Sequence, residues 1–283
     1  MSQSVSLSLF SILKSHTTKE EMEWLDSIPK MHLESVMTAF VKAPRHLSKT
    51  IIQTPIGIGD LIPEVPGFTV QDWNLVRLSR VWLLSFFAQL PKEQLVQKIE
   101  TLFDTAELNE LVALFSALPI LPYPDVWLPR ATDAVRSNMG FVFDSIALCN
   151  PYPFFHFPEL AWNQLVLKTI FNSKPIALIY GISQRKNKNL SESIFDFIRE
   201  RWAAGRDIPS NVWLLVSPYI SETHLPFLKR LFLSQKEEDV MAASLLCSES
   251  SLEPIQDLFN EHPKYKDEIQ KGKWNWSNFM TVC

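Results

Sequence analysis

The stretch "TVQDWNLVRLSRVWLLSFFAQL" (residues 69–90) has the clearest structural pattern in the chain. From Val70 through Trp73 to Leu84, apolar side chains recur every three or four residues, which is the spacing of an amphipathic helix. Thr69 precedes this run and Asp72 follows three positions later, a variant of the capping pattern. We therefore predict a helix over residues 69–90 with Thr69 as its N-cap.

Helical periodicity also dominates the rest of the sequence, so the predicted fold class is all-α. Helices are expected at 18–43 (two, broken near Pro29), 92–103, 105–118, 124–149 (with a break near Gly140), 159–172, 189–204, 210–219, 221–234, 236–248 and 251–261. For the helix at 189–204, Asn189 is the predicted N-cap and Gly205 the predicted C-terminal stop. Residues 44–68 are predicted to form a long ordered loop, and an extended stretch near Ile51–Ile52 is kept as an alternative.

The arrangement of these helices is predicted from composition and from one hairpin. Only 7 glycines accompany 19 prolines, which suits helices joined by stiff connections. Residues 225–250, "LPFLKRLFLSQKEEDVMAASLLCSES", look like a HEAT-type helical hairpin, but no fixed repeat period runs through the chain. We predict a single domain over residues 1–283, an irregular helical bundle or α-solenoid with HEAT-like hairpins at about 209–262.

Several classes of function have no signal in the sequence. The net charge of −4 and a pI near 5.9 argue against a nucleic-acid-binding protein. There is no phosphate-binding GxxxxGK[ST] loop and no GxSxG motif, and neither the histidines nor the cysteines have metal-site spacing. The acidic clusters lie at predicted helix starts and are not DDxxD motifs. We expect no cofactor and no metal, and we assign no catalytic residue.

The predicted location is the cytoplasm. The start "MSQSVSLSLFSILKSH" has no basic residue before its apolar run and no small-residue cleavage site after it. The uncharged stretch "LVALFSALPILPYP" (111–124) is too short to span a bilayer and contains three prolines. An apolar helix face on "VWLLSFFAQL" (81–90) is the nearest candidate for a membrane-surface protein, and burial of that face is the favoured interpretation.

Polar residues that could form a site are concentrated between 136 and 206, around the junction "NPYPFFHFPELAWNQLVLK" (150–168). In a structural interpretation, Asn150 hydrogen-bonds its own turn, Trp162 is a core residue, Asn163 pairs with exposed turn backbone, and the arginines balance nearby carboxylates. In a functional interpretation, Arg201 or Arg206 binds an anionic group, while Tyr152 and Trp202 supply flat aromatic surfaces. The candidate ligand- or partner-binding residues are Arg136, Asn138, Asn150, Tyr152, His156, Trp162, Asn163, Lys168, Arg201, Trp202 and Arg206.

Residues 136–182, "RSNMGFVFDSIALCNPYPFFHFPELAWNQLVLKTIFNSKPIALIYGI", followed by "FDFIRERWAAGRDI" (195–208), resemble the EboA family. The shared features are an arginine–asparagine helix end, an NPYP turn, a WNQxVLK helix and an ERWAAGR helix terminus. The resemblance is best over 136–206 and weaker toward the ending "IQKGKWNW", and the first 120 residues contain no motif of the family.

The resemblance implies a role in metabolite traffic. Members of the family are encoded in small gene clusters together with a prenyltransferase-like membrane protein and a TIM-barrel isomerase-like protein. Such clusters are implicated in moving secondary-metabolite precursors, for example an aromatic indolic pigment precursor, from cytoplasm to periplasm. The resemblance thus implies those two proteins as partners and an aromatic metabolite as a ligand, and it transfers no catalytic residue.

We therefore expect a non-enzymatic cytosolic helical protein that supports traffic or export of a precursor by binding partner proteins, an aromatic small molecule, or both. Attachment at the inner membrane through a partner is the alternative location. The alternative function is an enzyme that modifies such a precursor in a helical pocket, with His156, Tyr152 or Glu200 as acid–base groups. A deep pocket containing one of these groups favours the enzyme, whereas a shallow groove with exposed apolar surface favours partner binding.

Overall fold

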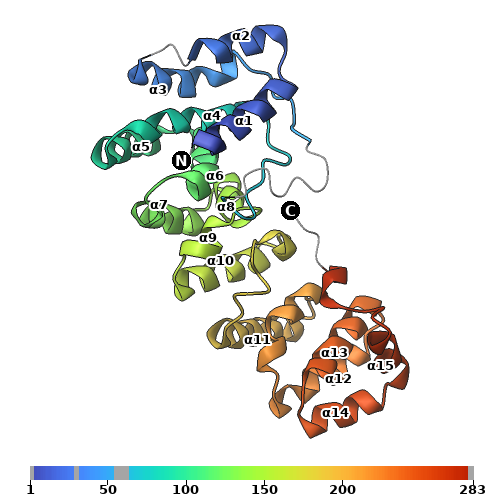
Figure 1. Cartoon of the computed structure of the whole chain (residues 1–283). Helices are drawn as coiled ribbons and strands as arrows, with labels where there is room; N and C mark the ends of the chain where they lie inside the picture. The colour runs from blue at the N-terminus through green and yellow to red at the C-terminus, as the bar shows by residue number, and fades with distance from the viewer. Residues whose placement is uncertain (1–2, 29–31, 54–63, 280–283) are drawn as a thin grey trace. The chain divides into compact units, whose positions relative to one another are not determined.

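The computed structural model of the chain describes residues 3–28, 32–53 and 64–279 (Figure 1). These residues group into two compact units, a first unit over Met1–Pro158 and a second over Glu159–Val282. This division does not test the predicted single domain over residues 1–283, which stays a prediction.

The all-α prediction is confirmed, since every named element of the described residues is a helix. The first unit contains α1 (Gln3–His16), α2 (Lys19–Ser27), α3 (Leu33–Lys42), α4 (Leu75–Leu83), α5 (Lys92–Thr105), α6 (Leu108–Ala117), α7 (Pro124–Arg136), α8 (Gly140–Ala147) and α9 (Tyr152–His156), with 3₁₀ helices at Ala43–Arg45, Leu84–Gln89 and Leu118–Ile120. The second unit contains α10 (Glu159–Phe171), α11 (Lys188–Ala203), α12 (Leu225–Phe232), α13 (Glu237–Glu249), α14 (Glu253–Asn260) and α15 (Pro263–Gln270), with 3₁₀ helices at Ile176–Leu178, Ser210–Leu215, Ser217–Tyr219, Glu222–His224 and Trp276–Phe279.

Helix α4 is the centre of the first unit. It packs against α1, α3 and α6, while α6 in turn packs against α8. Leu75, Leu78, Val81 and Leu83 of α4 have no exposed surface. Because burial of one such side chain contributes about 1.5–3 kcal/mol, α4 is fixed firmly enough to position polar side chains at its edge.

The helix predicted over 69–90 is shorter than expected. It begins at Leu75, and its N-cap is Asn74, whose Oδ1 accepts the N–H of Arg77 at 2.8 Å. Thr69 accepts a hydrogen bond from the Gln71 N–H instead, and Asp72 has a left-handed backbone with φ of 61°. The prediction of Thr69 as N-cap was therefore wrong.

Long-range backbone pairing is the reason for the late helix start. The Ile52 N–H donates to Trp73 O at 2.7 Å, the Asp72 N–H donates to Ile52 O at 3.0 Å, and Ile51 forms an isolated antiparallel bridge with Asn74. The backbone N–H of Asp72 and the carbonyl of Trp73, which a longer helix would contain, are thus already hydrogen-bonded to Ile52. The alternative of an extended stretch near Ile51–Ile52 is confirmed.

The apolar segment 81–90 is mostly interior. Val81, Leu83, Leu84 and Phe87 are each at most 1% exposed, so the membrane-surface alternative loses its candidate face. No helix among the described residues combines the length and the apolar character needed to cross a membrane.

Several other boundaries agree with the pattern in the sequence. Segment 18–43 contains α2 and α3, with Pro29 outside the described residues, and the break near Gly140 separates α7 from α8. Segment 210–219 is a pair of 3₁₀ helices and not the predicted α-helix. Every residue of Val212–Val216 is buried, and Pro209 and Pro218 lie on either side of this short buried run. Helices α12, α13 and α14 follow the expected pairs, while their HEAT-type character stays a prediction.

The N-cap of α11 lies two residues earlier than predicted. Asn187 is its N-cap and accepts the Leu190 N–H at 2.9 Å, whereas Asn189 donates from its side chain to Glu159. The predicted stop at Gly205 is confirmed. Gly205 has φ of 67° and its N–H donates to Trp202 O, while the Arg206 N–H donates to Arg201 O, which together form a Schellman motif.

Candidate functional site

The buried amide of Asn150 is the centre of the NPYP turn. Its Nδ2 donates to Phe115 O at 3.1 Å and to Ser145 O at 2.8 Å, and its Oδ1 accepts the Tyr152 N–H at 3.0 Å. One side chain therefore ties together the end of α6, the last turns of α8 and the start of α9. The expectation that Asn150 hydrogen-bonds its own turn is confirmed.

Tyr152 and His156 lie on α9. Tyr152 is fully buried, its hydroxyl donates to Pro124 O at 2.6 Å, and burial raises its pKa. His156 is half-buried with its ring centroid 4.8 Å from that of Tyr152, and burial lowers its pKa while Asp125 partly opposes the shift. Tyr152 thus has no exposed ring face to offer a ligand.

Trp162 and Asn163 are also used within the fold. The Trp162 Nε1–H donates to Arg185 O at 3.1 Å, and the Arg185 guanidinium lies 4.7 Å above the indole ring. Asn163 and Asn187 exchange two amide hydrogen bonds, at 3.1 and 2.7 Å. The expectation that Asn163 pairs with exposed turn backbone was wrong, because its partner is the N-cap side chain of α11.

The arginines and the tryptophan at the end of α11 do not share one site. Arg201 donates from Nε and Nη2 to Asp207 O at 3.3 and 3.0 Å. Trp202 lies against Phe227, with Arg230 at 4.2 Å from its ring centroid, and the side chain of Arg206 is exposed.

Of the remaining candidates, Arg136 is exposed and pairs with Asp133 one turn away at 3.1 Å, and Asn138 is exposed. Five candidates lie in the first unit, and the other six lie in the second unit. Only Asn163 and Lys168 of the eleven line a pocket described below.

That pocket is a groove between α10 and α11, here named the α10–α11 groove. It measures about 510 Å³ and is lined by Leu160, Asn163, Gln164, Leu167, Lys168, Phe171, Asn189 and Ser193. Leu160 is 80% exposed and Phe171 is 56% exposed, and burial lowers the pKa of Lys168. The groove is therefore mainly an apolar surface with a few polar groups at its edges.

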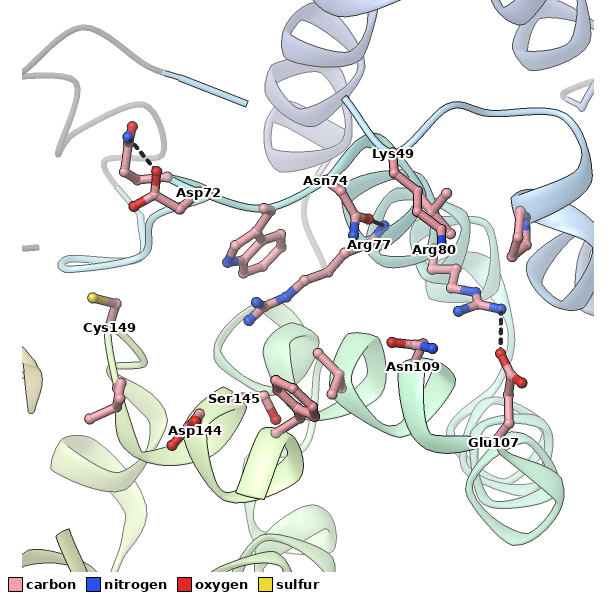
Figure 2. Close-up of a pocket in the computed structure, with 17 residues that line it drawn as sticks. Lys49, Asp72, Asn74, Arg77, Arg80, Glu107, Asn109, Asp144, Ser145 and Cys149 are labelled. Carbon is pink, nitrogen blue, oxygen red and sulfur yellow. Dashed lines mark hydrogen bonds and ion pairs between the residues drawn. The ribbon is translucent and has the colours of Figure 1, made fainter. Parts of the chain in front are cut away.

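A larger pocket, here named the α4–α6–α8 cavity, lies in the first unit (Figure 2). Its volume is about 720 Å³. It is lined by Pro44, Lys49, Gln71, Asp72, Trp73, Asn74, Val76, Arg77, Arg80, Glu107, Asn109, Val112, Phe141, Asp144, Ser145, Leu148 and Cys149. None of the residues proposed from the sequence lines this cavity.

Arg80 is part of the frame of the cavity. Its guanidinium is 1% exposed, donates from Nε to Phe40 O at 3.0 Å, and binds Glu110 at 3.0 Å and Glu107 at 3.6 Å. Glu110 also accepts the Glu107 N–H in the capping box of α6. Burial lowers the pKa of Arg80 and the two carboxylates oppose the shift.

Arg77 lies one turn before Arg80 and has a different environment. Its Nε donates to Ser116 Oγ at 2.9 Å, and its guanidinium lies 4.1 Å from the centroid of the Trp73 ring. Burial lowers the pKa of Arg77 to about 9, so the side chain is still a cation at neutral pH. The sequence does contain a sign of these two buried charges, since Arg77 and Arg80 interrupt the apolar run "LVRLSRVWLL".

The cavity has the groups needed to bind a small molecule. It combines a cation, side-chain amides and a hydroxyl with apolar walls from Val76, Val112, Phe141 and Leu148. Within the part of the chain that the structure describes, no cluster of three or more His, Cys, Asp or Glu side chains could hold a metal ion.

Comparison with known families identifies the chain. The model of the family described as "Metabolite traffic protein EboA" matches residues 5–217, more than half of the 283 residues. The chain belongs to the EboA family. The match extends the resemblance seen over 136–206 toward the N-terminus as far as residue 5, although the first 120 residues contained no recognised motif, and it includes every residue that lines the cavity. No curated protein and no solved structure gives a significant match to the chain.

Proposed function

We propose that this EboA-family protein serves metabolite traffic by binding a small molecule in the α4–α6–α8 cavity without catalysing a reaction. The cavity itself is the observation that carries this proposal. Its volume of about 720 Å³ lies within the range of roughly 300–1,000 Å³ that is typical of ligand pockets. Apolar and polar side chains from three packed helices converge on it, within the segment that the family model matches.

The proposed ligand is a secondary-metabolite precursor with an aromatic part, bound in the cytoplasm before export. The proposed partners are the prenyltransferase-like membrane protein and the TIM-barrel isomerase-like protein of the same gene cluster, and contact with the former would place the chain at the inner membrane. The exposed apolar side chains of the α10–α11 groove, Leu160 and Phe171, support a protein-binding surface on the second unit.

The geometry gives less support to an enzyme. Neither the cavity nor the groove is lined by His156, Tyr152 or Glu200. The Tyr152 hydroxyl is already bound to Pro124 O, and its raised pKa keeps it protonated at neutral pH. A general acid or base must reach the substrate, so these positions favour the non-catalytic proposal.

The proposal can be tested by native mass spectrometry of the full chain, purified gently from cells that express its neighbouring genes. Two matched variants separate the pockets: Val112→Trp fills the cavity from α6, and Leu167→Trp fills the groove from α10. Both positions are half-buried aliphatic residues on helices, and circular dichroism checks that each variant is folded.

We expect a small-molecule adduct on the wild-type chain and on Leu167→Trp, and its loss from Val112→Trp. An adduct that survives in folded Val112→Trp would place the ligand outside the cavity. A bound neighbouring protein with no small molecule in any preparation would make the chain an adaptor, and the cavity proposal would fall.

A further inference from the structure

Two arginines of the same helix line the α4–α6–α8 cavity, and only one of them has a partner for its charge. Arg80 binds Glu107, Glu110 and Phe40 O. A guanidinium has five N–H donors, and Arg77 uses one of them, on Ser116 Oγ. The N–H groups of its two terminal nitrogens have no hydrogen-bond or ion-pair partner among the described residues.

The position of Arg77 is unfavourable for a cation. Arg77 is the third residue of α4, where the positive end of the helix dipole disfavours positive charge, and no acidic residue lies in that first turn. Burial alone lowers its pKa to about 9, with no carboxylate opposing the shift. A desolvated cation without a counter-charge costs stability. The contacts of Arg77 with Ser116 and Trp73 do not supply that counter-charge.

The surroundings of Arg77 indicate what would bind there. Figure 2 shows the side chain extending from α4 into the cavity, toward the part of α8 that carries Asp144 and Ser145. Trp73 covers one face of the guanidinium, which leaves its edge for hydrogen bonds. Phe141, which is 69% exposed, adds an aromatic surface to the same cavity.

The carboxylates of the cavity do not make it a better site for a cation. Glu107 lies 3.6 Å from Arg80, and Asp72 accepts a hydrogen bond from Gln71 at 3.1 Å. Asp144 also lines the cavity. Arg77 forms no ion pair with it or with any other residue that the structure describes, so the cation is not neutralised within the cavity.

From these observations we infer that the cavity binds an organic oxyanion, a carboxylate or a phosphate ester, whose oxygens dock on the terminal nitrogens of Arg77 while its apolar part contacts Phe141 and Val112. Guanidinium and oxyanion form two parallel hydrogen bonds, which gives direction as well as affinity. This inference rests on the small-molecule binding proposed above and adds the chemical class of the ligand.

The test is isothermal titration calorimetry on the full chain with three probes of similar shape. The probes are 2-naphthoate, 2-naphthyl phosphate and the neutral 2-naphthamide. The variants are Arg77→Met, Arg77→Lys, the cavity-filling Val112→Trp, and Arg199→Met as a control that removes an exposed cation on α11. Thermal unfolding of each variant is measured in parallel.

We expect the wild-type chain and Arg199→Met to bind an anionic probe and to bind 2-naphthamide at least tenfold more weakly. Arg77→Met should lose roughly 10- to 100-fold in affinity for the anion, as expected for charge-assisted hydrogen bonds, with no loss of thermal stability. Arg77→Lys should retain part of the affinity, because it keeps the charge and loses the paired geometry. The stronger of the two anionic probes identifies the oxyanion as carboxylate or phosphate.

Equal binding of the amide and the anions, unchanged in Arg77→Met but lost in Val112→Trp, would overturn the oxyanion inference and leave the cavity as a ligand site. No binding of any probe, together with no native adduct, would remove the proposed function and this inference with it. A large fall in the unfolding temperature of Arg77→Met would also overturn the inference, because it would give Arg77 a structural role.

Discussion

The α4–α6–α8 cavity and the α10–α11 groove differ in what their walls leave unsatisfied. In the cavity a half-buried cation, Arg77, has donors without partners among the described residues, and the apolar walls range from the buried Val76 to the exposed Phe141. In the groove the amides of Asn163 and Asn187 satisfy each other, and the apolar side chains of Leu160 and Phe171 are exposed. A directed charge selects among small molecules, whereas exposed apolar area favours a broad contact, so the two pockets suit different kinds of partner.

The largest expected effect tests the frame of the cavity. Arg80→Met leaves the buried carboxylate of Glu110 without its cation, which should lower the free energy of unfolding by about 3–5 kcal/mol. Urea unfolding followed by circular dichroism measures the change. Arg77→Met is the matched control on the same helix and should not lower stability. Equal destabilisation by both substitutions would remove the distinction between a structural and a ligand-binding arginine.

The second prediction concerns the turn that fixes α8 at the cavity. Asn150→Ala removes three hydrogen bonds and leaves the carbonyls of Phe115 and Ser145 without this donor. Because unsatisfied buried polar groups are costly, we expect a loss of roughly 2–3 kcal/mol in urea unfolding. Asn138→Ala, at an exposed asparagine of the same unit, should change stability by less than about 0.5 kcal/mol. A similar small effect at both positions would make the NPYP turn unimportant for the fold.

The comparison also shows which features could be predicted from the sequence. Helical periodicity and the stop at Gly205 depend on nearby residues, so both could be predicted, as could the role of Asn150 in its own turn. The start of α4 could not, because Ile52 takes up the backbone groups of Asp72 and Trp73 from a distant part of the chain.

The cavity was missed for the same physical reason. An arginine in an apolar helix is visible in the sequence, but whether it has a counter-charge depends on which helices pack beside it. Arg80 meets Glu110 and Arg77 meets Ser116, both from α6. The motifs around 150–168, in contrast, are explained mainly by contacts within the fold, such as those of Tyr152 and Trp162.

A third prediction tests the polar edge of the groove. Asn187→Ala removes the N-cap of α11 and also the amide partner of Asn163, so we expect a loss of about 1–2 kcal/mol in urea unfolding. Asn189→Ala removes only a surface hydrogen bond to Glu159 and should cost less than about 0.5 kcal/mol. A larger loss of stability in Asn189→Ala than in Asn187→Ala would make Asn189 the helix cap, as predicted from the sequence.

The smallest expected effect is the pH dependence of stability that His224 of the second unit contributes. In the second unit, the His224 ring stacks on Phe195 at 3.8 Å, and its Nδ1 accepts the Ser221 N–H at 2.9 Å. Burial lowers the pKa of His224 below its ordinary value of 6.5, and the positive charge of Arg199 lowers it further. Protonation would also remove the acceptor for the Ser221 N–H.

The sign of this effect follows from proton linkage. Since the folded state has the lower pKa, the unfolded state takes up the proton first as the pH falls, so the contribution to stability is present above pH 6.5 and is lost toward the folded pKa. Unfolding free energies measured between about pH 7 and 5.5 should fall less in His224→Gln than in the wild-type chain, with the exposed His32→Gln as the control. Parallel curves for all three proteins would mean that protonation of His224 causes no loss of stability in this range.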